Sequence, residues 1–188
     1  CISLGTVQSE RGNAAEAEKA FRRAIDVAPR AINPRLALAN FFWTNNRQPE
    51  AEDSLKAALA IDPKHLAANR ALGTFYLASG RATEAEPFFK AVAEVSTTPD
   101  AKISLADYYA AINRTDDATR ILTELSAVEA TRSEATIRLA AIQAGQGNRA
   151  GALTMLRELL DKDPTDAKAR LLVTKILLVD GKPVDAMV

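Results

Sequence analysis

Leu72 to Val92 is the stretch that decides the fold, and it reads LGTFYLASGRATEAEPFFKAV. It opens with a leucine followed by a small residue, and this pair recurs every 34 residues, with one spacing of 33. The pairs are Leu4-Gly5, Leu38-Ala39, Leu72-Gly73, Leu105-Ala106 and Leu139-Ala140, and the sixth copy has Val173-Thr174 instead. A fixed period of this length is typical of proteins built from stacked structural repeats.

The second half of each copy carries an alanine and then two further apolar residues, at spacings of four and three. The sets are Ala17, Phe21 and Ala24; Ala51, Leu55 and Ala58; Ala85, Phe89 and Val92; Ala118, Leu122 and Leu125; and Ala152, Leu156 and Leu159, with Ala186 beginning a sixth. Such spacings place residues on one face of a helix, and small residues beside large ones let two helices approach closely. Each copy is therefore predicted to contain a helix with one buried face.

A glycine or an asparagine separates the two halves of every copy. These residues are Gly12, Asn46, Gly80, Asn113, Gly147 and Gly181. Both residue types enter the left-handed backbone region at low cost, as the end of a helix often requires. Prolines stand at the boundary between one copy and the next, at Pro29, Pro63 and Pro164, and Pro34 and Pro99 lie close to matching places. The pattern predicts two helices per copy, joined by a tight turn.

Two helix starts are predicted in detail. Pro87 falls inside the second helix of the third copy, and with Thr83 as the N-cap it would lie near the helix start, where proline costs little. Thr131 and Glu134 have the spacing of a capping box, which is predicted to open the first helix of the fifth copy.

This pattern resembles the tetratricopeptide repeat family, in which each copy is an antiparallel helix pair and successive pairs stack into a right-handed superhelix. The resemblance implies an all-α, right-handed superhelical solenoid of about five and a half repeats, forming a single array over residues 1–188. The repeats fall at approximately 1–29, 30–63, 64–97, 98–130, 131–164 and 165–188. The departures from the family pattern are Gln8, Asn69, Lys102, Gln143 and Arg170, and we expect each to weaken a single helix interface.

Composition argues against several classes of function. The 24 basic and 24 acidic residues cancel, so no bulk charge attracts nucleic acid or an anionic membrane. No apolar run approaches the roughly 20 residues that span a bilayer. We therefore expect a soluble protein of the cytoplasm or the periplasm. The first copy begins inside a helix and the sixth ends inside one, so we expect the chain to be part of a longer protein.

No motif in the sequence carries the chemistry of an enzyme. His65 is the only histidine, and no nucleophile stands at a recognisable spacing from it. The single cysteine, Cys1, argues against an internal disulfide and a zinc cluster of the usual kind. Asp161, Asp163 and Asp166 lack the glycine and the bidentate glutamate that a calcium loop requires. The sequence thus predicts no catalytic residue, no metal site and no cofactor.

The surface remains as the candidate for function. In the family that this chain resembles, the first helices of successive copies line a concave groove that receives extended or helical peptides. The resemblance places in this groove Leu36, Asn40, Trp43 and Thr44; Arg70, Thr74 and Leu77; Ile103, Asp107 and Ala110; and Ile137 and Ala141. Trp43, the only tryptophan, is of the residue type that most often anchors an interface. The alternative, that Trp43 only packs between repeats, stays open.

The resemblance implies a protein or peptide partner, or a second copy of the chain. Chaperone-binding members of the family hold a terminal carboxylate with Lys, Asn and Arg side chains. The matching positions here are Leu36, Asn40, Ala71, Asp100 and Ser104, so we predict no such carboxylate clamp. The apolar groove residues favour an amphipathic helix or a similar ligand.

We therefore predict a non-enzymatic scaffold for protein–protein interaction. The alternative is a structural spacer or self-association module of a larger bacterial assembly or export protein. In that case, apolar residues of the two end regions, 1–7 and 171–188, would stack against other copies.

Overall fold

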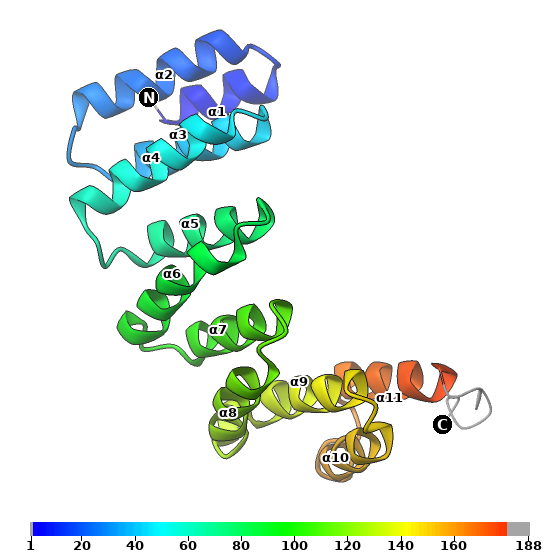
Figure 1. Cartoon of the computed structure of the whole chain (residues 1–188). Helices are drawn as coiled ribbons and strands as arrows, with labels where there is room; N and C mark the ends of the chain where they lie inside the picture. The colour runs from blue at the N-terminus through cyan, green and yellow to red at the C-terminus, as the bar shows by residue number, and fades with distance from the viewer. Residues whose placement is uncertain (1, 180–188) are drawn as a thin grey trace. The chain divides into compact units, whose positions relative to one another are not determined.

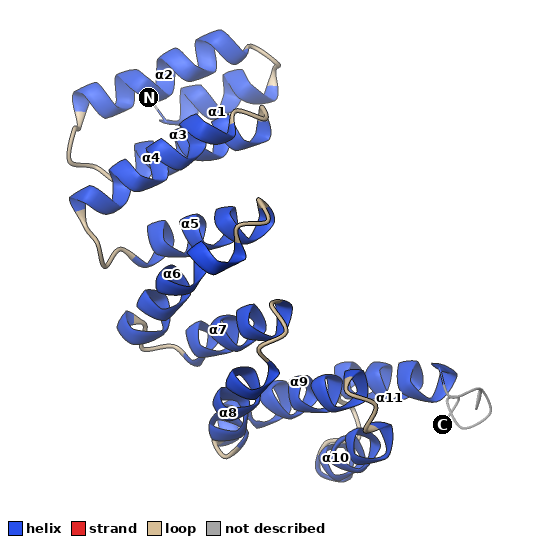
Figure 2. Ribbon diagram, in the orientation of Figure 1, coloured by secondary structure: helices blue, strands red, loops and turns tan. Residues whose placement is uncertain are grey.

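The computed structural model describes residues 2–179, which form helices joined by short loops (Figures 1 and 2). This part of the chain contains eleven α-helices, one short 3-10 helix and no strand, which confirms the predicted all-α class. The chain divides into two compact units, Cys1–Ser96 and Thr97–Val188, and each is described by itself. Cys1, Gly181 and Ala186 lie outside the described residues. The expectation of one continuous array stays a prediction.

The first unit consists of three helix pairs. Its helices are α1 (Ile2–Glu10), α2 (Ala14–Val27), α3 (Asn33–Thr44), α4 (Gln48–Ile61), α5 (Leu66–Ala78) and α6 (Ala82–Val95). Within each pair the two helices pack against each other, and α3 and α5 also pack against the second helix of the preceding pair (Figure 1). The first and second halves of each sequence repeat are therefore the two helices of a pair, as predicted.

The second unit continues the same pattern with one addition. Its helices are α7 (Pro99–Ala111), α8 (Thr115–Ser126), the 3-10 helix η1 (Glu129–Thr131), α9 (Arg132–Gly145), α10 (Arg149–Lys162) and α11 (Ala167–Val179). The helix η1 stands at a repeat boundary without proline, and the sequence did not predict it. Helix α11 packs against both α9 and α10.

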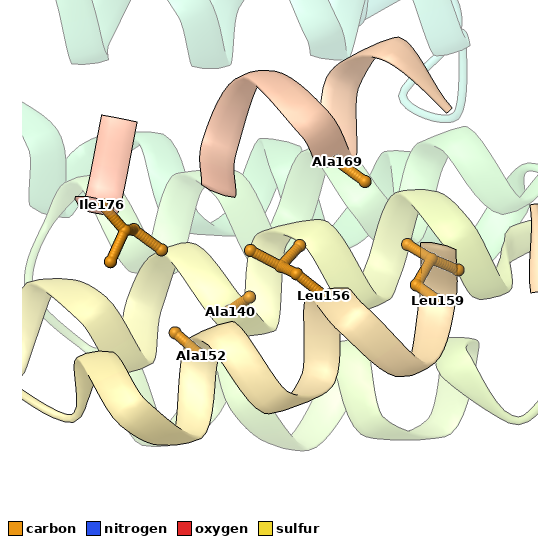
Figure 3. Packing of buried hydrophobic residues seen from close by; sticks show 6 residues of the cluster. All are labelled: Ala140, Ala152, Leu156, Leu159, Ala169 and Ile176. Carbon is orange, nitrogen blue, oxygen red and sulfur yellow. The ribbon is translucent and has the colours of Figure 1, made fainter. Parts of the chain in front are cut away.

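The core lies along the second helices, where the sequence placed it. The predicted sets on α2, α4, α6, α8 and α10 are all buried. In the second unit, Ala152, Leu156 and Leu159 of α10 join Ala140 of α9 and Ala169 and Ile176 of α11 in one cluster. Figure 3 shows these side chains gathered between the three helices. Within each unit, a helix pair thus buries its apolar face partly against itself and partly against the neighbouring pair of that unit, as repeat proteins do.

The small residues of the first helices permit a close approach of the second helices. A Cβ atom built on Gly5 would lie 2.6 Å from Cε1 of Phe21, and one built on Gly73 would lie 3.2 Å from Cε2 of Phe89. The phenylalanine of the second helix therefore occupies the space that a larger side chain at the glycine would take. Ala39, Ala106 and Ala140, at the equivalent positions, are likewise buried.

The predicted helix-to-helix turns are confirmed at the five positions that the structure describes. Asn46 and Asn113 have φ angles of 59° and 61°, and Gly12, Gly80 and Gly147 have φ angles of 77°, 73° and 89°. An asparagine tolerates this region better than other residues with a Cβ atom. Each tight turn therefore depends on the residue type that the sequence repeats there.

The predicted helix starts are close to those observed, but the predicted caps are not formed: Thr83 is not the N-cap of α6, and Thr131 opens α9 without a capping bond. Helix α6 has Arg81 as its N-cap, so Thr83 lies within the first turn and Pro87 lies inside the helix. Pro87 has no N–H, which leaves the carbonyl of the exposed Thr83 to solvent. Thr131 is the N-cap of α9 but makes no capping bond. Its hydroxyl instead donates to the carbonyl of Leu125 at 2.6 Å, because η1 turns the threonine back toward α8.

Candidate functional site

Two first helices of the first unit present the predicted groove residues on one side. Helix α3 buries Leu38, Ala39, Phe41 and Phe42, and α5 buries Leu72, Gly73, Phe75 and Tyr76. The remaining sides carry Leu36, Asn40, Trp43, Thr44, Arg70, Thr74 and Leu77, which we name the α3/α5 face. Leu36, Trp43 and Leu77 are half-buried, whereas the four polar members are exposed. The face therefore combines partly covered apolar side chains with accessible polar ones.

Trp43 links the two helices of this face. Its ring lies 4.9 Å from the ring of Phe75 on α5, measured between centroids, in an edge-to-face arrangement with an interplanar angle of 86°. This arrangement is favourable for aromatic pairs. Trp43 is nevertheless only half-buried. Trp43 thus packs between repeats and also keeps part of its surface accessible, so the two alternatives for this residue are compatible.

The α3/α5 face carries positive charge alone. Helices α3 and α5 contain no aspartate or glutamate, and their charged residues are Arg35 and Arg70. Arg35 is half-buried and donates to the carbonyl of Ala31 at 3.0 Å. Arg70 is exposed and makes no hydrogen bond or ion pair with any residue between 2 and 179. An unpaired guanidinium therefore stands on the same face as Trp43.

The first helices of the second unit place most of the remaining predicted residues on the surface. Asp107 and Ala141 are exposed, and Ala110 and Ile137 are half-buried. Ile103 differs, because only 4% of its surface is exposed. Helix α7 buries residues on several sides, and its isoleucine is removed from water with them. Ile103 is therefore a buried residue of α7 rather than a surface residue.

Arg138 on α9 organises the charges around Asp107, and sequence reasoning missed it. Its Nε lies 2.7 Å from Oδ1 of Asp107 on α7, and its Nη1 lies 3.0 Å from Oε1 of Glu134. The hydrogen bond to Asp107 raises the pKa of Arg138 above its usual value, although burial opposes the shift. The charge of Asp107 is thus already paired with Arg138 of the same unit, whereas Arg70 has no ion-pair partner in residues 2–179.

A second set of arginines, at the N-caps of second helices, was also missed. We name it the arginine clasp, and Arg81 shows it most fully. The guanidinium of Arg81 lies 4.5 Å from the ring centroid of Tyr76 and pairs with Glu84 of its own helix at 2.6 Å. It also pairs with Glu52 on the preceding second helix, at 2.5 Å. One side chain therefore joins three helices.

The clasp recurs in the neighbouring copies. Arg47 lies 4.3 Å from the ring centroid of Phe42 and pairs with Glu18 at 2.5 Å and Glu50 at 2.8 Å. In the second unit, Arg114 lies 4.5 Å from the ring centroid of Tyr109 and pairs with Asp117 at 2.6 Å. The sequence signal was present, because Arg47, Arg81 and Arg114 follow the repeat spacing.

The first and fifth copies replace the aromatic and the arginine of the clasp together. Gln8 and Asn13 hold the two positions in the first copy, and Gln143 and Asn148 hold them in the fifth. In each pair the asparagine amide donates to the glutamine, at 2.8 Å and 3.4 Å respectively. The glutamines that depart from the family pattern therefore belong to a shorter, local version of the same junction.

The clasp shifts the acidity of its carboxylates. The hydrogen bond from Arg81 lowers the pKa of Glu52 to about 2, against the opposing effect of burial, with Lys56 and Tyr76 contributing in the same direction. Burial raises the pKa of Glu18, but hydrogen bonds from Arg47 and Arg22 outweigh it, so the net pKa is lowered. Both glutamates are therefore held in the charged form, as partners of a cation.

Other residues that could carry chemistry have structural roles. His65 is the N-cap of α5, and its Nδ1 accepts a hydrogen bond from the backbone N–H of Ala68 at 3.2 Å. Asp166 accepts hydrogen bonds from the N–H groups of Lys168 and Ala169 and from the hydroxyl of Ser133. Over residues 2–179 no group of acidic, histidine or cysteine side chains has the arrangement of a metal site.

Several large apolar residues are exposed at the two ends of the described chain. Leu4 is 56% exposed, whereas Leu38 and Leu72, at the same repeat position, are buried. Val7, Leu171, Leu178 and Val179 are also exposed. None of the helices within residues 2–179 has the length and apolarity needed to cross a membrane.

Comparisons with solved structures identify the fold. MamA superposes with a TM-score of 0.67 at 19% identity, covering 88% of this chain and 97% of that one. The protein pilF of Pseudomonas aeruginosa gives 0.69 at 18%, covering 99% and 85%. YrrB, described as a TPR protein with an unusual peptide-binding site, gives 0.60 at 19%, covering 90% and 88%. At these identities the likeness shows the fold alone. A search of curated protein sequences finds no match to the chain.

Family models extend this result to the sequence. One model, described as tetratricopeptide repeat, matches residues 49–106 and 109–176. A second model with the same description matches residues 2–65. Together the matches run through nearly all of the described helices, and the helix pairs, small residues and left-handed turns agree with them. The chain belongs to the tetratricopeptide repeat family.

Proposed function

We propose that the chain is a non-enzymatic scaffold that binds a peptide or helix of another protein on its first helices, with the α3/α5 face as the principal site. The family is one of interaction modules, which supports the general class of function. The α3/α5 face adds a location, because it combines accessible polar groups with the partly exposed ring of Trp43.

The partial exposure of Trp43 is the observation that carries this proposal. An aromatic ring held by one neighbour, Phe75, is already ordered and loses little conformational freedom when a partner covers its remaining surface. Leu36 on α3 and Leu77 on α5 add further half-buried apolar surface. Preorganised apolar anchors surrounded by polar groups are typical of interface hot spots.

A selection of random 12-residue peptides displayed on phage tests the proposal. Peptides selected on the wild-type protein should bind at least about tenfold more weakly to Trp43→Ala, which corresponds to about 1.4 kcal/mol. Lys19→Ala, at an exposed position of α2, is the matched control and should bind as the wild type does.

A second variant guards against a folding defect in Trp43→Ala. Thr74→Gln adds bulk without charge on the exposed side of α5 and does not touch the core, so it should also weaken binding. Circular dichroism melting of each variant confirms that the helices persist. Peptides that bind wild type, Trp43→Ala and Thr74→Gln equally would overturn the assignment to the α3/α5 face.

Self-association is a second candidate, and the exposure of Leu4 and Val7 favours it. These residues lie on α1 at positions where apolar side chains are normally covered. Sedimentation at a series of protein concentrations should then show a dimer that dissociates on dilution, and Leu4→Lys should shift it toward the monomer. A monomer at every concentration would remove this candidate.

A further inference from the structure

We propose that the partner of the α3/α5 face is an acidic peptide segment that presents a carboxylate to Arg70 and an apolar side chain to Trp43. This inference rests on the proposed function and adds the chemistry of the ligand. It follows from how charge is distributed among the helices of the first unit.

Acidic residues in this unit are concentrated on the second helices. Helices α2, α4 and α6 carry three each, which are Glu16, Glu18 and Asp26; Glu50, Glu52 and Asp53; and Glu84, Glu86 and Glu94. Helices α3 and α5 carry none. The chain as a whole is neutral, so this absence is a local feature and not a consequence of composition. A ligand on the α3/α5 face would therefore meet no acidic side chain from either helix.

Arg70 is the cation on this face that is free to bind. It is exposed and has no ion pair or hydrogen-bond partner in the described chain, whereas Arg35 already bonds to a backbone carbonyl. The positions one turn away on α5, Leu66 and Thr74, carry no charge. A carboxylate can accept two parallel hydrogen bonds from a guanidinium, which favours an acidic side chain as its partner.

The helix geometry sets the spacing between the two anchors. Trp43 contacts Phe75, which follows Arg70 by five residues on α5. At 1.5 Å per residue, the position on α5 that Trp43 contacts is about 7–8 Å from Arg70 along the helix axis, so the two anchors must be met by different residues of the peptide.

One arginine on a partly apolar surface argues for a peptide and against a nucleic acid. Binding to a phosphate backbone needs several cations that act together. Here the second anchor is an aromatic ring, and Asn40, Thr44 and Thr74 around it are uncharged.

The charge of the selected peptides tests this inference separately from the site. Peptides that depend on Trp43 should be rich in Asp and Glu. Their affinity, measured by calorimetry, should fall about tenfold or more for Arg70→Glu and should weaken as salt is raised. Arg23→Glu is the matched control, because Arg23 is exposed on α2 and has no ion pair in the described chain.

A charge reversal completes the experiment. Replacing the acidic residues of a selected peptide by lysine should abolish binding to the wild type and restore it for Arg70→Glu. Trp43-dependent peptides that are neutral or basic, or that bind Arg70→Glu as well as wild type, would overturn the inference and leave the proposed site intact. If no selected peptide depends on Trp43, the proposed function fails, and this inference fails with it.

Discussion

Arg81 at the start of α6 reaches Glu52 on α4, the second helix of the preceding pair, with Nη1 2.5 Å from Oε2. The same carboxylate accepts a hydrogen bond from the Tyr76 hydroxyl at 2.8 Å and pairs with Lys56 at 2.6 Å. Only 13% of the Glu52 side chain is exposed, so its charge is poorly compensated by water. The contact therefore joins neighbouring repeats by a polar interaction outside the apolar core.

Acid should weaken this junction. The pKa of Glu52 is about 2 in the folded protein, against an ordinary value of 4.5, so the folded state binds the proton more weakly than the unfolded state. The stabilisation from Glu52 is therefore complete above about pH 5 and is lost as the pH falls from 4.5 toward 2. Urea unfolding between pH 7 and pH 2 should show this loss.

Glu52→Gln separates the effect from that of other carboxylates. The variant should be less stable at pH 7, by about 1–2 kcal/mol, and the difference from wild type should shrink below pH 4.5. Glu16→Gln, at an exposed position of α2, is the matched control. A difference between wild type and Glu52→Gln that stays constant down to pH 2 would contradict the role assigned to the charge.

Lysine should not replace arginine in the clasp. Arg81 pairs with two carboxylates and lies over an aromatic ring at once, and only a planar guanidinium offers this combination. We expect Arg81→Lys to lower the free energy of unfolding and with it the melting temperature. The exposed and unpaired Arg23 provides the comparison, and Arg23→Lys should have almost no effect. Equal melting temperatures for the two variants would argue against a structural role for the clasp.

Two glycines in helices should respond oppositely to alanine. Gly5 faces the ring of Phe21, which is itself buried, so a new methyl group has no space and Gly5→Ala should destabilise by about 1–3 kcal/mol. Gly145, in the last turn of α9, has no atom within 4 Å of the Cβ position. Gly145→Ala should therefore stabilise by about 0.5 kcal/mol through helix propensity. Chemical denaturation of both variants checks the signs, and a stabilised Gly5→Ala would contradict the close approach.

The fold was predictable because the same pattern of buried residues and turn residues recurs in successive copies. The set Ala85, Phe89 and Val92 and the turn residue Gly80 each have equivalents in other copies, so an error in one copy is corrected by the rest. Helix caps were less predictable. Thr83 is of a residue type that caps helices, but α6 begins at Ala82 with Arg81 as its N-cap.

The site was predictable only in outline. Helical spacing placed Trp43 and Arg70 on the surface, but spacing could not show that Trp43 contacts Phe75 on another helix. Ile103 occupies a surface position of the pattern and is nevertheless buried, because α7 buries residues on several of its sides. The partners Arg81 and Glu52 are 29 residues apart, and a single repeat does not reveal their contact.

The fifth copy allows the clasp to be built where it is missing. Gln143, Asn148 and Thr119 stand at the positions of the aromatic, the arginine and the preceding glutamate. Asn148→Arg alone should destabilise, because Asn148 accepts a hydrogen bond from the N–H of Gly151 at 3.1 Å, and losing this cap costs about 1 kcal/mol. In Gln143→Tyr and in Thr119→Glu, made singly, the new side chain has no arginine to pair with.

In the triple variant the arginine would lie over the tyrosine and pair with the glutamate. The free energy of unfolding of the triple variant should therefore exceed the value expected from adding the three single effects by about 1 kcal/mol or more. Urea unfolding of the single and triple variants measures this coupling. If the effects of the three single changes on the free energy of unfolding simply add up, the clasp requires a helix geometry that the fifth copy does not share.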